Sequence, residues 1–285
     1  MIKIERNNLD DIAKQYLSKL QKEKGFNKKK GNIIHNHWIK NRARIIKSDN
    51  LNSIINEFNA LNQDGLNAFK IYMIGQYEDF FYTRKFGKWL AKELDVRTCP
   101  YCNRQYTFTI EAGTKDIRPE FDHFYSKSDY PYLALSFYNL VPACPTCNHT
   151  KSSNPIDKNP YFEGFDNNYR FKIKTKDGEE FSLDWALKNK LEIDFTDTEN
   201  NKNIEEFALK KLYNEHIDYV KEIINKAQAY NESYYNSLKV SFKGLGKQDP
   251  EIERFIWGNY LDIAEHEKRP LSKLTKDILE QLKIK

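Results

Sequence analysis

Residues 99–102 read CPYC and residues 144–151 read CPTCNHTK, and these two stretches decide the fold that we predict. The chain has four cysteines, and all of them lie in these stretches: Cys99, Cys102, Cys144 and Cys147. A C-x-x-C turn lets two thiolates reach one ion at about 2.3 Å, and two such turns close a tetrahedral four-sulfur site with no open position. The spacing therefore predicts one structural Zn²⁺ held by all four cysteines.

The alternatives to a zinc site are two disulfides, a redox pair and chance. A reducing cytoplasm argues against disulfides, and the duplicated C-P-x-C argues against chance. A redox pair would instead give thiols that titrate freely without zinc release. The segment between the two cysteine pairs is longer than in a minimal zinc ribbon, so what it carries decides the function.

Four further motif elements stand between and after the cysteine pairs: Asp122-His123, Asn139-Leu140, Asn148 and Lys151. Their order resembles the HNH endonuclease family, whose pattern is C-x-x-C, D-H, N-L and then C-x-x-C-[NH]-x-x-K. The matching text in this chain is CPYC, FDHF, YNLVPA and CPTCNHTK. The match is specific because every element is present in order, although it covers only about 57 of the 285 residues.

The resemblance implies a ββα-metal fold. The Asp-His pair would lie on the first strand, Asn-Leu would open the second, and the residue after the last cysteine would lie on the following helix. Asp122 and Asn148 would then converge on one catalytic ion, and their hard oxygen atoms suit Mg²⁺ or Mn²⁺. His149 is an alternative third ligand, and its imidazole would favour a softer ion.

The resemblance also assigns roles to the remaining motif residues. His123 would take a proton from the water that attacks phosphorus. Neighbours on a strand point to opposite faces, so we expect a local irregularity at Asp122 that turns both side chains to one ion. Asn139 would pin the loop between the strands and so orient His123. Lys151 would contact a substrate phosphate or cap the end of the helix.

Helical periodicity dominates the rest of the chain. Apolar residues recur at one-face spacing from Leu9 to Leu20, and less regular patterns run through 33–47, 51–61, 66–74 and 77–94. Strand-like segments follow Pro160, then a helical stretch at 204–238 and a helical end from Asp249. We predict an α+β chain with a helical region at 1–95, the HNH core with its zinc site at 96–160 and a mixed, mostly helical region at 161–285.

The net charge of +5 is weak support for a polyanionic partner. Residues 1–50 hold 13 Lys or Arg against 5 Asp or Glu, including the run 28–30, which is either a solvated face or a phosphate-contacting arm. His35 and His37 form an H-x-H that we interpret as structural or exposed. We expect no membrane-spanning segment and no secretory signal, and therefore the cytoplasm.

The resemblance to the HNH family implies a metal-dependent endonuclease. DNA rather than RNA follows only from what HNH relatives usually cut. The motif text also resembles stand-alone bacterial HNH proteins of Septu-type and retron-linked anti-phage defence systems, which implies an ATPase as a partner. A lone site cuts one strand, so double-strand cutting would need a homo-oligomer, two events or a partner. The competing hypothesis is a non-catalytic zinc-stabilised module that binds nucleic acid or protein.

Overall fold

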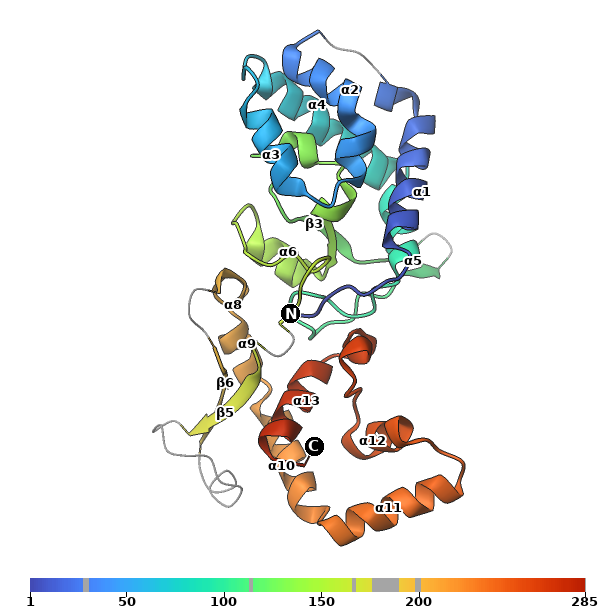
Figure 1. Ribbon diagram of the computed structural model, residues 1–285, viewed down its shortest axis with the longest axis vertical. Helices are drawn as coiled ribbons and strands as arrows, with labels where there is room; N and C mark the ends of the chain where they lie inside the picture. Colours follow the sequence, from blue (N-terminus) through green and yellow to red (C-terminus); the bar gives the residue numbers. More distant parts are fainter. Residues whose placement is uncertain (28–30, 113–114, 166–167, 176–189, 198–200, 285) are drawn as a thin grey trace. The chain divides into compact units, whose positions relative to one another are not determined.

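The fold of the computed structural model is α+β, and its described residues form three two-stranded antiparallel sheets among many helices (Figure 1). The structure describes residues 1–27, 31–112, 115–165, 168–175, 190–197 and 201–284. Contacts divide the chain into two compact units. The N-terminal unit consists of Ile4–Val96 and Thr107–Tyr161, and the C-terminal unit consists of Met1–Lys3, Arg97–Tyr106 and Phe162–Lys285. The three regions that we predicted from the sequence stay a prediction.

The helices of the N-terminal unit follow the apolar periodicity of the sequence closely. They are α1 (Leu9–Lys22), the 3₁₀ turn η1 (Lys24–Asn27), α2 (Ile33–Lys47), α3 (Leu51–Asn59), α4 (Leu66–Glu78), the π-helical turn η2 (Asp79–Thr83) and α5 (Phe86–Leu94). The pattern at 77–94 predicted one helix where the structure has a π turn and a break. Lys85, which has the left-handed φ of 59°, separates η2 from α5.

The rest of this unit is a strand-strand-helix segment with short connections. It contains β1 (Ile110–Ala112), β2 (Lys115–Ile117), β3 (Glu120–His123), the 3₁₀ turns η3 (Pro131–Leu133) and η4 (Phe137–Asn139), β4 (Leu140–Ala143) and α6 (Pro145–Lys151). β3 pairs antiparallel with β4, and α6 packs on β3. The predicted order of first strand, second strand and helix is therefore present.

Aromatic side chains build the core that holds this segment in place. Helices α2 and α4 pack against η3, whose residues are buried. The Trp38 indole of α2 donates a hydrogen bond to the Tyr132 carbonyl (3.1 Å), and Phe58 of α3 stacks on the Tyr132 ring with centroids 4.1 Å apart. Burial of rings this large contributes roughly 1.5–3 kcal/mol each. The helices thus fix the connection between β3 and β4.

The C-terminal unit combines one hairpin with several short helices. Its elements are β5 (Phe171–Thr175), β6 (Leu191–Phe195), α8 (Lys202–Glu206), α9 (Leu209–Asn214), α10 (Ile217–Ala229), α11 (Glu232–Gly244), α12 (Asp249–Trp257), the 3₁₀ segment η5 (Ile263–Lys268) and α13 (Ser272–Gln281). β5 pairs antiparallel with β6, and α13 packs on β5. The strand-like segments after Pro160 are therefore confirmed as strands.

The prediction of one continuous helix at 204–238 is wrong, because the structure has several shorter helices there. Ala208 has a left-handed φ of 47° and ends α8 before α9, and the Asn231 side chain accepts the Tyr234 N–H to begin α11 as a new helix. A side-chain cap competes with helix continuation without changing the apolar spacing. Among the residues that the structure describes, no helix is long and apolar enough to span a membrane.

Candidate functional site

The two C-x-x-C turns bring four buried sulfurs together. The four Sγ atoms all lie within 4.8 Å of one another, and none of the cysteines forms a disulfide. Cys144 is the N-cap of α6, where its sulfur accepts the Cys147 N–H at 3.4 Å. The first turn closes with the Asn103 N–H donating to the Cys99 carbonyl at 2.7 Å. Four buried thiols at this separation can hold a metal ion such as zinc.

The strand β3 presents two polar side chains to α6. Glu120 and Asp122 are two positions apart, so they share one face of the strand, and Asn148 and Lys151 are three apart, so they share one face of the helix. The Asn148 side-chain amide donates to the Glu120 carboxylate at 2.7 Å, and Lys151 Nζ lies 3.2 Å from the Asp122 carboxylate. Two polar pairs therefore join β3 to α6.

Lys151 is fully buried between β3 and α6. Its Nζ also donates to the His123 carbonyl at 2.8 Å, and the Asp122 side chain is only 2% exposed. A buried ammonium is tolerated only where a charge or acceptors satisfy it. This position favours a structural role for Lys151, and its contact with a substrate phosphate stays an untested prediction.

The irregularity predicted at Asp122 is absent. The register of β3 with β4 runs unbroken through Asp122↔Val141 and His123↔Leu140. Alternation along a regular strand sends the two side chains different ways: Asp122 contacts Lys151, and His123 contacts Ala134. The predicted irregularity is not needed, because β3 ends at His123. Asp122 and His123 therefore border the same cavity from a regular strand end.

His123 is buried in an aromatic and apolar setting. Its Nε2 lies 3.0 Å from the Ala134 carbonyl, an acceptor, so Nε2 carries the proton and Nδ1 keeps its lone pair. The Tyr77 ring of α4 meets the imidazole edge to face with centroids 4.5 Å apart. Burial, with a smaller effect from the Lys127 ammonium, lowers the pKa of His123 from 6.5 to about 3. The imidazole is therefore neutral at pH 7.

Asn139 holds the connection between the two strands. Its side-chain amide donates to the carbonyls of Tyr125 (3.0 Å) and Leu133 (3.1 Å), and its side-chain oxygen accepts the Tyr125 N–H (2.8 Å). The backbone carbonyl of Asn139 accepts the Phe124 N–H beside His123. These hydrogen bonds join the Asn139 side chain to the loop between the strands, and its predicted role in orienting His123 stays a prediction. Its effect on any reaction stays a prediction.

One cavity of about 440 Å³ joins these groups. Four predicted site residues border it: Asp122, His123, Asn148 and the alternative ligand His149. The other residues that line it were not indicated by the motifs: Tyr77, Tyr82, Phe121, Ser126, Lys127, Ser128, Ser152 and Ser153. The His149 side chain is 75% exposed and lies 3.6 Å from the Glu120 carboxylate. The structure thus brings the motif residues of β3 and α6 to one opening.

Tyr77, Glu120 and Lys127 are among the residues of this site that sequence reasoning missed. A usable signal existed for Glu120, because it lies two positions before Asp122 on a predicted strand and so shares its face. Tyr77 has no such signal, since it comes from a helix far away in the sequence. Lys127 lies between the Asp-His and Asn-Leu elements, in a segment where the motif indicates no residue.

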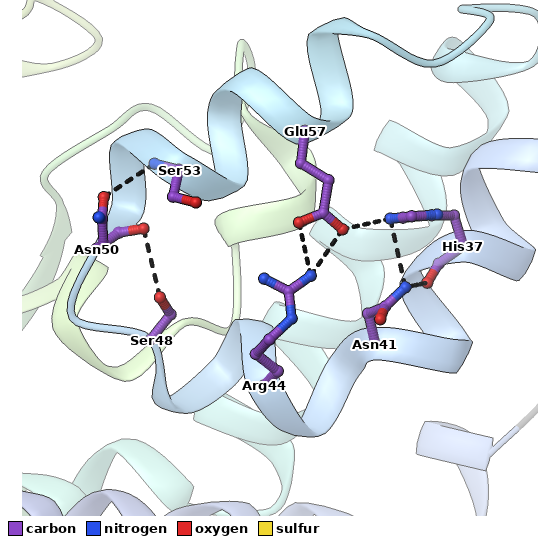
Figure 2. Close-up of polar contacts among 7 residues, drawn as sticks. All are labelled: His37, Asn41, Arg44, Ser48, Asn50, Ser53 and Glu57. Atoms are coloured by element: carbon purple, nitrogen blue, oxygen red, sulfur yellow. Dashed lines mark hydrogen bonds and ion pairs between the residues drawn. The ribbon is translucent and has the colours of Figure 1, made fainter.

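The histidines of IIHNHWIK do not converge. The centroid of the His35 ring lies 4.6 Å from the centroid of the Tyr72 ring. By contrast, His37 Nε2 lies 2.5 Å from the Glu57 carboxylate, which also accepts from Arg44 (Figure 2). Residues two apart on a helix face different directions, so the pair does not form a metal site with both rings. The basic run 28–30 lies outside the described residues.

Comparisons with known proteins leave the family open. No protein-family model matches the chain. No curated protein matches it, and no solved structure does. What the site does must therefore be argued from its own residues.

Proposed function

We propose that the chain is a metal-dependent endonuclease of the HNH type that hydrolyses phosphodiester bonds in DNA. The observation that carries the proposal is the His123 imidazole. Its Nε2–H is engaged by the Ala134 carbonyl, and it borders a cavity that Asp122 and Asn148 also border. A neutral histidine with one nitrogen fixed as a donor is oriented to accept a proton at the other.

The chain's own residues divide the work as follows. Nδ1 of His123 accepts a proton from a water molecule in the cavity, and the Ala134 carbonyl and the Tyr77 ring keep the imidazole in one orientation. Asn139 keeps the loop beside His123 in place by its three side-chain hydrogen bonds. Such orientation matters because a misplacement of about 1 Å can lower a rate a hundredfold.

The oxygen atoms where β3 meets α6 suit a hard divalent ion. Asp122 and Asn148 border the cavity and both offer oxygen, and Glu120 offers a further carboxylate where it accepts from Asn148. Mg²⁺ commonly takes one or two carboxylates and keeps several waters. Among the described residues, the four cysteines are the only group of three or more His, Cys, Asp or Glu side chains close enough to hold an ion. When bound, Mg²⁺ or Mn²⁺ supplies charge that offsets the negative charge building on phosphate.

The four-cysteine group is a structural zinc site in this proposal. All four sulfurs are buried, so the site has no position open to substrate. Cys144 and Cys147 belong to α6, the helix that carries Asn148. Bound zinc therefore holds the start of α6, and the helix in turn places Asn148 beside β3.

One observation favours a second candidate function, a zinc-stabilised module that binds nucleic acid or protein without cutting. The Asp122 carboxylate already forms a buried ion pair with Lys151, so it has a structural use that requires no catalytic metal. The module and the nuclease differ in cleavage, while binding is common to both. A role in anti-phage defence, an ATPase partner and homo-oligomerisation remain proposals that rest on the family resemblance.

Metal dependence tests the proposal. Supercoiled plasmid is incubated with the zinc-loaded full chain, either without added divalent ion or with Mg²⁺ or Mn²⁺. We expect nicked plasmid only where Mg²⁺ or Mn²⁺ is added, because phosphate charge must be neutralised in the transition state. Nicking at the same rate without added ion would contradict the proposed chemistry, and binding without any nicking would favour the module.

A further inference from the structure

Lys127 lies in a tight turn directly after β3. The turn is closed by the Asp129 N–H donating to the Ser126 carbonyl at 3.1 Å and by the Ser128 N–H donating to the Ser126 hydroxyl at 3.1 Å. Ser126 itself is buried. The backbone at Lys127 is therefore held in place beside the cavity that His123 borders.

The ammonium of Lys127 is half-buried and forms no ion pair with any residue that the structure describes. Among the residues that the structure describes, Lys127 forms no ion pair and no hydrogen bond, and its Nζ lies over the Tyr77 ring at 4.5 Å from the centroid. Burial lowers the pKa of Lys127 below its usual range, and the Glu78 carboxylate offsets this only in part. A cation–π contact with the Tyr77 ring does not replace the hydration that a buried ammonium loses.

The Tyr77 ring places this charge beside His123. The centroid of the same ring lies 4.5 Å from the imidazole centroid, and all three side chains border the cavity. The cavity wall also includes four serines, whose hydroxyls are donors that phosphate oxygens accept: Ser126, Ser128, Ser152 and Ser153. The cavity thus combines one unpaired cation with several neutral donors.

Lys151 provides the contrast. It is the lysine that the sequence motif indicates for a phosphate, but it is fully buried and satisfied by Asp122 and the His123 carbonyl. Lys127 has the opposite situation, because it borders the cavity and, among the described residues, only the Glu78 carboxylate acts on its charge, without forming an ion pair with it. An entering anion meets Lys127 and not Lys151.

We propose that Lys127, with the serine hydroxyls around it, forms a phosphate-binding subsite that holds one DNA phosphate beside His123. The subsite rests on the proposed nuclease function and names the residue that binds its substrate. Lys127 is a binding residue here, since it contacts the phosphate directly.

Equilibrium binding tests this proposal separately from cleavage. A fluorescein-labelled 20-base-pair DNA duplex is titrated with the zinc-loaded full chain at several salt concentrations, without added divalent ion. Lys127→Gln is compared with Lys40→Gln, which removes the same charge from an exposed position on α2. We expect Lys127→Gln to weaken binding roughly five- to tenfold and to reduce the magnitude of the salt slope by about 0.9, the value for one lost phosphate contact. Lys40→Gln should leave both unchanged.

Lys127→Arg keeps the charge, so it separates loss of the charge from a general disturbance of the cavity. DNA binding that is retained in Lys127→Arg and weakened in Lys127→Gln supports the subsite. Equal affinity and equal salt slope in Lys127→Gln and Lys40→Gln would overturn it. Nicking of plasmid is measured on the same samples. If the wild type nicks plasmid but Lys127→Gln leaves the salt slope of binding unchanged, the subsite alone is overturned. If Lys127→Gln reduces the salt slope but the wild type does not nick plasmid, the nuclease is overturned and the phosphate contact remains.

Discussion

The variant Cys144→Ser is expected to lose zinc and most of its stability. Zinc binding to four thiolates contributes about 10–16 kcal/mol in small zinc domains at pH 7, and a serine hydroxyl does not replace a thiolate ligand. Cys144 also caps α6, so the start of that helix loses a hydrogen-bond acceptor. Zinc per chain should fall from about one to below roughly a tenth after dialysis.

The measurement is metal analysis together with urea unfolding. Thr146→Ser is the matched control, since Thr146 lies between the two cysteines and is exposed. This control should keep both the zinc and the urea midpoint. Zinc retained at one per chain in Cys144→Ser would contradict a four-sulfur site, and a wild-type chain that binds no zinc would contradict the site altogether.

Lys151→Met is expected to lower the free energy of unfolding by about 3–5 kcal/mol, the usual cost of breaking a buried ion pair. Methionine has nearly the same length but no charge, so it leaves the Asp122 carboxylate buried without its partner. The His123 carbonyl loses its donor as well. Urea unfolding of the zinc-loaded protein gives the difference.

Two comparisons show whether the ion pair is responsible. Lys40→Met removes an exposed lysine and should stay within about 0.5 kcal/mol of the wild type. Adding Asp122→Leu to Lys151→Met should recover much of the loss, because the unpaired charge is gone. A Lys151→Met protein of unchanged stability but weaker DNA binding would instead show that Lys151 contacts phosphate.

Local patterns predicted most of the elements. The apolar spacing placed α1, α2 and α3 within a few residues of their observed bounds, because each buries one continuous face. The C-x-x-C spacing predicted the sulfur cluster, because two residues between ligands suit one metal ion. The break at Ala208 was not predictable this way, since apolar periodicity continues across it.

The site was predicted less completely than the elements. The motif placed Asp122 and Asn148 at one cavity, but the contacts that decide what each side chain can do come from elsewhere. The buried ion pair of Lys151 with Asp122 depends on the packing of α6 against β3. The position of the Lys127 ammonium depends on the Tyr77 ring of α4, over which it lies. Neither contact has a signal in the spacing of the motif, because each joins separate segments of the chain.

The most direct test of the central claim is the rate of plasmid nicking in Mg²⁺ for the wild type and for His123→Ala. Zinc content and the urea midpoint are measured on both, and His37→Ala, whose ring pairs with Glu57 outside the cavity, is the control. Loss of a general base predicts a rate at least about a hundredfold lower in His123→Ala, with zinc retained and His37→Ala unaffected. Equal nicking by the wild type and His123→Ala, or no nicking by the wild type, would contradict the account.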